Sequence, residues 1–224
     1  MKIKIAISSN KFFFQKTFPI LKKSLIESGF ENKDIYLFIG QFDNFYKKII
    51  DDINIFQLDY SCFEYNSLIC IVENYIESDY WFLMQDTCTA GKNFKKLLYT
   101  RTDFNKEKIA LKHYPSMSIG GYKYNYLLKY RDDLIALKNK DYSEDGIQKF
   151  KFWTCHNEDY LLWRKDKELC STYDFENHGF KFTNFDHENI YGAETFRIKE
   201  YYPQLDITKY KSNFGSGPIY KTTL

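Results

Sequence analysis

The sequence predicts one α/β domain in which helices cover both faces of a mostly parallel sheet, giving three layers. The main observation is that short apolar runs alternate with amphipathic segments over residues 1–85, which is typical of parallel strands joined by helices. A chain of 224 residues can bury a sizeable core without help from disulfides or metals. No low-complexity linker separates its halves, so a single domain spanning residues 1–224 is expected.

Four strands are expected in the first half of the chain. Residues 2–8 alternate between apolar and polar side chains, as a strand with two different faces does. Residues 34–39 and 53–58 are short apolar runs. Residues 80–84 are nearly all apolar, which is expected of a central parallel strand that is buried on both faces.

Each of these strands is expected to lead into a helix. Residues 17–28 carry apolar side chains at helical spacing, and Gly29 follows where a left-handed residue would end the helix. Residues 66–77 place their apolar side chains on one helical face. A further helix between the strands at 34–39 and 53–58 completes the expected alternation.

The second half of the chain is less regular. We expect a strand at residues 108–112, a turn at Gly120-Gly121, and helices over residues 126–138 and 158–163. After residue 165 the sequence is rich in polar and turn-forming residues, and no element is predicted there.

Composition limits the partners and the compartment. The 32 basic and 30 acidic residues give a formal charge of +2, without the concentrated positive field that nucleic-acid binding requires. Five cysteines, odd in number and without a CxxC pair, fit reduced thiols in a cytoplasm. The first residues alternate like a strand and do not resemble a signal peptide, and no apolar run is long enough to span a membrane. We therefore expect a cytoplasmic protein without a membrane span.

Polar side chains follow two of the expected strands and open one of the expected helices. In open α/β sheets ligands bind beyond the carboxyl ends of the strands, so these side chains are candidate ligand contacts. Each also has a structural interpretation, because Asp opens ordinary turns and short polar residues cap helices. The residues are Ser8, Ser9, Asn10, Tyr65, Asn66, Gln85, Asp86, Thr87 and Cys88.

This order of elements over residues 1–165, with these polar motifs, resembles the nucleotide-diphospho-sugar transferases of the GT-A fold, a Rossmann-like three-layer α/β/α fold. In that family the fourth strand ends in an Asp-x-Asp motif that holds the donor, partly through a divalent metal. This chain has Asp86-Thr87-Cys88 and lacks the second Asp. The resemblance implies donor binding by the residues named above other than Cys88, with residues 1–100 as the nucleotide-sugar-binding half.

The resemblance also implies a metal, Mn²⁺ or Mg²⁺, at Asp86. Cys88 and His187 are the further candidate ligands, although a thiol suits a hard cation poorly. The missing second Asp makes this cofactor doubtful.

A Glu158-Asp159 pair opens the helix expected at 158–163, as in inverting enzymes of this family. An inverting transfer needs a base that removes a proton from the attacking hydroxyl, and a carboxylate can serve. Asp159 is the first candidate and Glu158 the second, although acidic residues also favour the first turn of any helix. Arg197, or Lys199 in its place, would neutralise the departing diphosphate. Residues 101–224 would then form the acceptor-binding half and a C-terminal loop.

The implied function is transfer of a sugar, most simply from a UDP-sugar, to a hydroxyl of a glycan acceptor with inversion. The main alternative is a non-catalytic carbohydrate-binding or scaffold protein on the same fold. A sugar-phosphate nucleotidyltransferase fits less well, because no glycine-rich loop follows the first strand. The sequence names neither the sugar, the acceptor, the linkage nor the oligomeric state, and it leaves the retaining or inverting outcome open.

Overall fold

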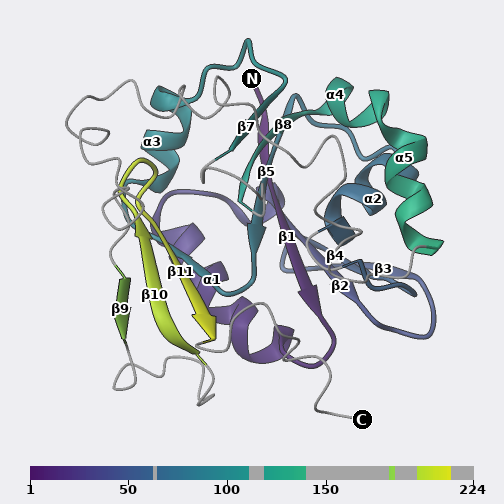
Figure 1. Cartoon of the computed structure of the whole chain (residues 1–224), viewed down its shortest axis with the longest axis horizontal. Helices are drawn as coiled ribbons and strands as arrows, with labels where there is room; N and C mark the ends of the chain where they lie inside the picture. The colour runs from purple at the N-terminus through teal and green to yellow at the C-terminus, as the bar shows by residue number, and fades with distance from the viewer. Residues whose placement is uncertain (63–64, 111–118, 140–181, 185–195, 213–224) are drawn as a thin grey trace.

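The computed structural model describes residues 1–62, 65–110, 119–139, 182–184 and 196–212, and it confirms the α/β class (Figure 1). A mixed seven-stranded sheet has the order β3-β4-β2-β1-β5-β8-β7. Its strands are β1 (Ile3–Asn10), β2 (Ile35–Gly40), β3 (Tyr46–Ile50), β4 (Ile53–Gln57), β5 (Tyr80–Gln85), β7 (Lys108–Ala110) and β8 (Gly120–Lys123). Five α-helices are described, with short 3₁₀ turns at Asn32–Asp34 (η1) and Leu137–Asn139 (η2); they are α1 (Phe14–Glu27), α2 (Tyr65–Glu73), α3 (Phe94–Arg101), α4 (Tyr124–Lys129) and α5 (Arg131–Ala136).

The sheet has a parallel core and antiparallel edges, so the expectation of a mostly parallel sheet needs correction. Strands β4, β2, β1 and β5 are parallel neighbours. Strands β3, β8 and β7 pair antiparallel with their neighbours. The parallel core nevertheless contains all four strands that were predicted in the first half of the chain.

The helix expected between residues 39 and 53 does not exist; strand β3 takes its place. Asp51 and Asp52 both have positive φ, 51° and 64°, and they turn the chain back from β3 into β4. A two-residue turn with this pair of left-handed conformations matches the twist of an antiparallel hairpin. The chain therefore passes from β2 to β4 through a hairpin strand.

Three other elements differ from their predictions. Gly120 and Gly121 form no turn but lie within β8. Glycine is required at 121 because the ring of Tyr80 lies where a Cβ would be. The helix predicted over residues 126–138 is divided at Tyr130 into α4 and α5. Helix α2 ends at Glu73 and not at residue 77, because Tyr75 adopts a positive φ of 49°.

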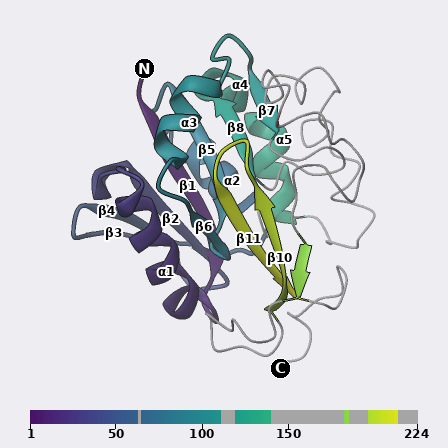
Figure 2. The same cartoon turned by 90° about the vertical axis from the view of Figure 1, so that its left-hand side faces the viewer.

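Helices cover both faces of the sheet (Figures 1 and 2). Helices α1 and α3 pack on one face, called here the α1 face, and α2, α4 and α5 pack on the other, the α2 face. Strands β1 and β5 are buried on both faces, which explains why the sequence of β5 is almost wholly apolar. Within the described ranges, no helix is both long and apolar enough to cross a membrane.

A second, antiparallel sheet packs on the α1 face, and the sequence did not predict it (Figure 2). Its order is β6-β11-β10-β9. Its strands are β6 (Cys88–Ala90), β9 (Phe182–Asn184), β10 (Phe196–Tyr202) and β11 (Ile207–Ser212). Asp206, in the β10–β11 turn, accepts hydrogen bonds from the Asn93 amide (3.1 Å) and the Tyr201 hydroxyl (2.9 Å), so the C-terminal hairpin is tied to the start of α3.

Candidate functional site

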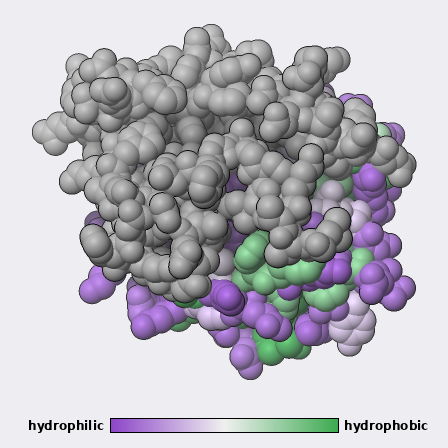
Figure 3. Space-filling model, turned by 60° about the horizontal axis from the view of Figure 1, so that its bottom comes forward, coloured by the Kyte–Doolittle hydropathy of each residue, from purple (hydrophilic) through white to green (hydrophobic). Residues whose placement is uncertain are grey.

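The candidate site lies where the parallel strands β1 and β5 end side by side. Helix α1, which follows β1, and helix α2, which precedes β5, lie on opposite faces of the sheet. The chain thus winds in opposite directions on the two sides of this strand pair, and open α/β sheets bind ligands at such a point. Strand β1 points toward the bottom of Figure 1, and the described surface there mixes apolar and hydrophilic side chains (Figure 3).

Asp86 is buried at the end of β5 and is held by two hydroxyl groups. Ser9 and Thr17 both donate hydrogen bonds to its Oδ2, the latter at 2.7 Å. Burial raises the pKa of the Asp86 carboxyl, while these hydroxyls and the backbone amides of residues 86 and 87 oppose that rise. The carboxylate therefore joins the ends of β1 and β5 to the first turns of α1.

Asn66 joins the end of β1 to the chain that enters α2. Its Oδ1 accepts a hydrogen bond from the Cys62 amide at 2.7 Å, and its Nδ2 donates to the Ser9 carbonyl at 3.4 Å. Ser8 makes a parallel connection, because its Oγ donates to Ser67 Oγ (2.9 Å) and accepts from the Ser67 amide (3.2 Å). These buried polar groups bind one another and fix the position of α2 relative to β1.

Asn10 shapes the turn between β1 and α1. Its Oδ1 accepts hydrogen bonds from the amides of Phe12 (3.0 Å) and Phe13 (3.2 Å). The turn leaves the Phe12 ring exposed, with the Lys11 ammonium 5.2 Å from the centre of that ring. An exposed aromatic ring and a cation thus lie next to the polar end of β1.

Two residues at the end of β2 were not predicted as part of the site. Gly40 ends β2 so close to α2 that a Cβ there would lie 2.5 Å from Nδ2 of Asn66. Gln41 follows with a φ of 74°, and its buried Oε1 has no hydrogen-bond partner among the described residues. A left-handed residue that is not glycine, directly after a parallel strand, marks stored strain of the kind that functional sites carry.

The remaining donor candidates differ in exposure. Gln85 and Thr87 are partly exposed at the end of β5, and the Thr87 carbonyl accepts a hydrogen bond from the Tyr210 amide at 2.9 Å. Tyr65 is fully buried in the apolar core of the α2 face. Cys88 is fully buried in the apolar core of the α1 face.

The described residues do not by themselves fit a divalent cation. The described parts of the chain contain no group of three or more His, Cys, Asp or Glu side chains that could hold a metal ion. Asp86 already accepts hydrogen bonds within the chain, and the Cys88 thiol lies among apolar side chains. His187 lies outside the described residues, so the predicted metal depends on groups beyond this part of the chain.

The predicted base also lies outside the described residues, as both Asp159 and Glu158 do. Arg197 belongs to β10, and its backbone alone is described. The structure therefore brings Ser9, Asn66 and Asp86 together at the strand ends, while the donor-binding and catalytic assignments stay predictions. Thr17 and Ser67 are additional members of the site, and they could be found only from the packing of α1 and α2 against the strand ends.

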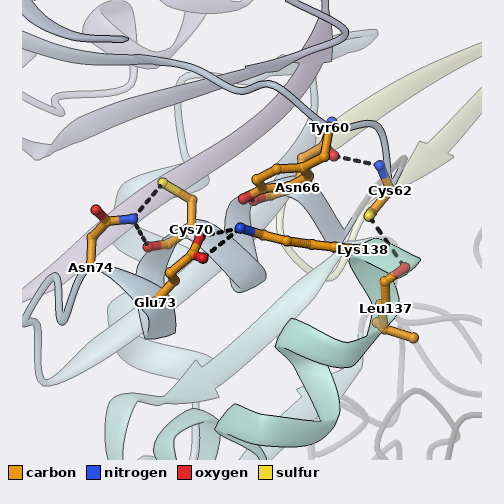
Figure 4. Close-up of polar contacts among 8 residues, drawn as sticks. All are labelled: Tyr60, Cys62, Asn66, Cys70, Glu73, Asn74, Leu137 and Lys138. Carbon is orange, nitrogen blue, oxygen red and sulfur yellow. Dashed lines mark hydrogen bonds and ion pairs between the residues drawn. The ribbon is translucent and has the colours of Figure 1, made fainter. Parts of the chain in front are cut away.

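A polar cluster beside the site connects η2 to α2 (Figure 4). Lys138 Nζ donates to both carboxylate oxygens of Glu73, at 2.5 and 2.6 Å, and lies 4.4 Å from the centre of the Tyr60 ring. The Tyr60 hydroxyl donates to the Asn66 carbonyl at 3.4 Å. Burial raises the pKa of the nearby Cys70 thiol, which argues against a nucleophilic role for it.

No family model matches the chain, and a search of curated proteins finds no match either.

Proposed function

We propose that the protein is a glycosyltransferase of GT-A-like, three-layer fold that transfers a sugar from a nucleoside-diphosphate donor, most simply a UDP-sugar, to a hydroxyl of a glycan acceptor. The supporting observation is that Ser9, Asn66 and Asp86, predicted from three separate segments, meet at the adjoining ends of β1 and β5. Strand ends of this kind, where the winding direction reverses, are the usual ligand position in α/β sheets.

In this proposal the buried polar groups shape the site, and their exposed neighbours contact the donor. Asp86 and Asn66 form their hydrogen bonds with other groups of the chain, so they hold the main chain of β1 and α2 in place. The exposed Phe12 ring offers a stacking surface for a base, and Lys11 beside it offers positive charge to the diphosphate. Gln41 is strained and half-buried, and the Nε2 of its carboxamide would donate a hydrogen bond to an edge of the base.

The proposed reaction is an inverting displacement. The acceptor oxygen forms a bond to the anomeric carbon while the bond from that carbon to the diphosphate oxygen breaks. The acceptor proton passes to Asp159, or to Glu158 in its place, and the electron pair leaves with the nucleoside diphosphate. Arg197 stabilises the charge that develops on the diphosphate. A bound Mn²⁺ or Mg²⁺ would supply further positive charge there, but no step in this scheme requires it.

A second candidate function is non-catalytic binding of a nucleotide sugar or glycan on the same fold. One observation favours it: the single carboxylate at the end of β5 is hydrogen-bonded to Ser9 and Thr17, and Cys88 replaces the second Asp of the family motif. Such a protein would bind a donor and transfer nothing.

A thermal-shift screen against UDP-, GDP-, dTDP- and CMP-sugars, each with and without Mn²⁺, tests both functions. A ligand at about 100 times its Kd stabilises the native state by about 2.7 kcal/mol, which raises Tm by several degrees. We expect a shift with one nucleotide family that is reduced in Phe12→Ala and kept in Tyr99→Ala, which removes another exposed ring on α3.

Release of nucleoside diphosphate in the presence of mixed glycan acceptors then separates the two candidates. Turnover supports the transferase, and donor binding without turnover supports the binding protein. No thermal shift with any donor, in a protein that melts cooperatively, would contradict the donor site itself.

A further inference from the structure

Strand β3 forms an exposed edge of the seven-stranded sheet. It pairs with β4 on one side, and no described strand lies on its other side. Four of the nine large apolar side chains that are exposed in the described residues occur here in one short segment. They are Phe45 (44% exposed), Tyr46 (55%), Ile49 (63%) and Ile50 (45%).

These apolar side chains lie on both faces of the strand. Lys47 is opposite Phe56, which belongs to the core of the α2 face, so Ile49 lies on that face as well. Ile50 is opposite Ile53, which belongs to the core of the α1 face, so Tyr46 lies on the α1 face. A flat surface could cover only one of these faces. A strand added alongside β3 would cover both and would also pair the free main-chain edge.

The charge pattern of this segment identifies the strand that fits. Residues 47–52 read Lys-Lys-Ile-Ile-Asp-Asp, with two bases, two apolar residues and two acids in succession. Two antiparallel copies, related by a two-fold axis at Ile49, place Lys47 of each copy opposite Asp51 of the other and bring the two Ile49 side chains together. Lys48 then lies diagonally across from Asp52, within reach of its long side chain. Oppositely charged residues facing each other across an antiparallel pair are stabilising, and like charges are destabilising.

From this self-complementarity we infer that β3 is a homodimer interface, in which it pairs antiparallel with β3 of a second copy of this chain. Lysines on an edge strand ordinarily prevent pairing with other chains. Here they exclude partners that lack acids at matching positions, whereas a second copy supplies Asp51 and Asp52. Asp51 has an ion pair with Lys22 at 3.6 Å, but its side chain is largely exposed and accessible to a partner. The inference is independent of the proposed function.

Sedimentation velocity from low micromolar to near-millimolar concentration tests the interface. The wild-type chain should shift from monomer toward dimer as concentration rises. Lys47→Glu/Lys48→Glu should stay monomeric over the whole range, because its acids would face the aspartates of the second copy. Both side chains lie on an edge strand, so the fold should persist, and a thermal melt verifies this.

A mixing experiment tests the register. Asp51→Lys/Asp52→Lys should also be monomeric alone, and an equimolar mixture with Lys47→Glu/Lys48→Glu should form a heterodimer. Should the lysines strain the positive-φ turn, Ile49→Asp provides a second variant that breaks the dimer, with Ile26→Asp on α1 as the matched exposed control. A wild-type chain that stays monomeric, a dimer that survives Lys47→Glu/Lys48→Glu, or a dimer lost in Ile26→Asp would overturn the inference.

Discussion

Replacing Gly40 by Ala tests whether the end of β2 and the start of α2 form one wall of the donor site. The new Cβ would lie 2.5 Å from Nδ2 of Asn66 and 2.9 Å from the Tyr60 carbonyl oxygen, where ordinary contacts begin at 3.4 Å. Asn66 must therefore withdraw by about 1 Å, a shift that its 3.4 Å hydrogen bond to the Ser9 carbonyl cannot absorb.

The expected loss of stability combines two effects. Overpacking a close contact costs about 1–3 kcal/mol. Losing the hydrogen bond from Asn66 to Ser9 costs about 1 kcal/mol more. We expect Gly40→Ala to lower the free energy of unfolding by about 2–4 kcal/mol, and to lower Tm by about 4–16 °C in a domain of this size. Because the displaced groups line the proposed site, affinity for the donor nucleotide should also fall.

Gly29→Ala is the matched control. Gly29 has a φ of 102° at the far edge of the sheet, and a Cβ there meets only Lys95 Cδ at 3.5 Å. Left-handed strain should cost about 1–2 kcal/mol without touching the site. Urea denaturation and calorimetric titration with the nucleotide found in the donor screen measure both variants at a temperature at which both are folded. Equal nucleotide affinity in the two variants would refute the assignment of Asn66 to the site.

Three other substitutions test separate features. Burial lowers the pKa of Lys4 from 10.5 to about 8, so the unfolded state binds its proton more tightly and wild-type stability should rise between these pH values. In urea melts, the free energy of unfolding of the wild type should rise by about 2 kcal/mol relative to that of Lys4→Met between about pH 7 and 9.5. A stability difference between the two proteins that does not change with pH would contradict this. Gln41→Gly relieves left-handed strain and should raise stability by about 0.5–1 kcal/mol while weakening nucleotide binding, which the same melts and titrations measure. Gly91→Ala would place a Cβ on the Asp206 carboxylate and so loosen the hydrogen bonds that hold the C-terminal hairpin to the start of α3. Limited proteolysis should then cut this hairpin before the rest of the chain. An unchanged order of cleavage would argue that Asp206 does not hold the hairpin in place.

The sequence predicts well those elements whose burial gives them a complete local pattern. Strand β5 is buried on both faces, so its apolar run is continuous and its position is clear. Helix α1 has one buried face, and Gly29 after it adopts the expected left-handed conformation, with a φ of 102°. In both cases the residues of the element and its immediate neighbours are enough to predict its type and position.

The missed elements depend on contacts that no local pattern contains. Strand β3 is largely exposed, and its Asp51-Asp52 turn lacks the glycine that marks most two-residue hairpins. Gly121 is required by the ring of Tyr80, a residue distant in sequence, whereas a Gly-Gly pair by itself predicts a turn. Strand β11 pairs with β6 across more than a hundred residues. Such pairings are fixed by tertiary packing.

The candidate site divides in the same way, into contacts that the strand pattern predicts and contacts that only tertiary packing creates. The ends of β1 and β5 lie together because parallel strands place their carboxyl ends at one edge, so Ser9 and Asp86 could be expected to approach each other. Thr17 reaches Asp86 only because α1 packs on the same face, and the conformation of Gln41 depends on the hydrogen bond from its amide to the Tyr60 carbonyl. These two residues carry no sequence motif.

The contacts of Asp86 suggest how the site could operate with one carboxylate where the resembled family has two. A buried carboxylate with two hydroxyl partners is costly to desolvate, and removing a partner from such a network leaves an unpaired charge. Its benefit lies in position, because it fixes the ends of β1 and β5 before any ligand arrives. A fixed site requires no reorganisation when charge develops during a reaction. In the proposed function, Asp86 would contribute geometry, and basic side chains such as Lys11 and Arg197 would meet the charge of the diphosphate.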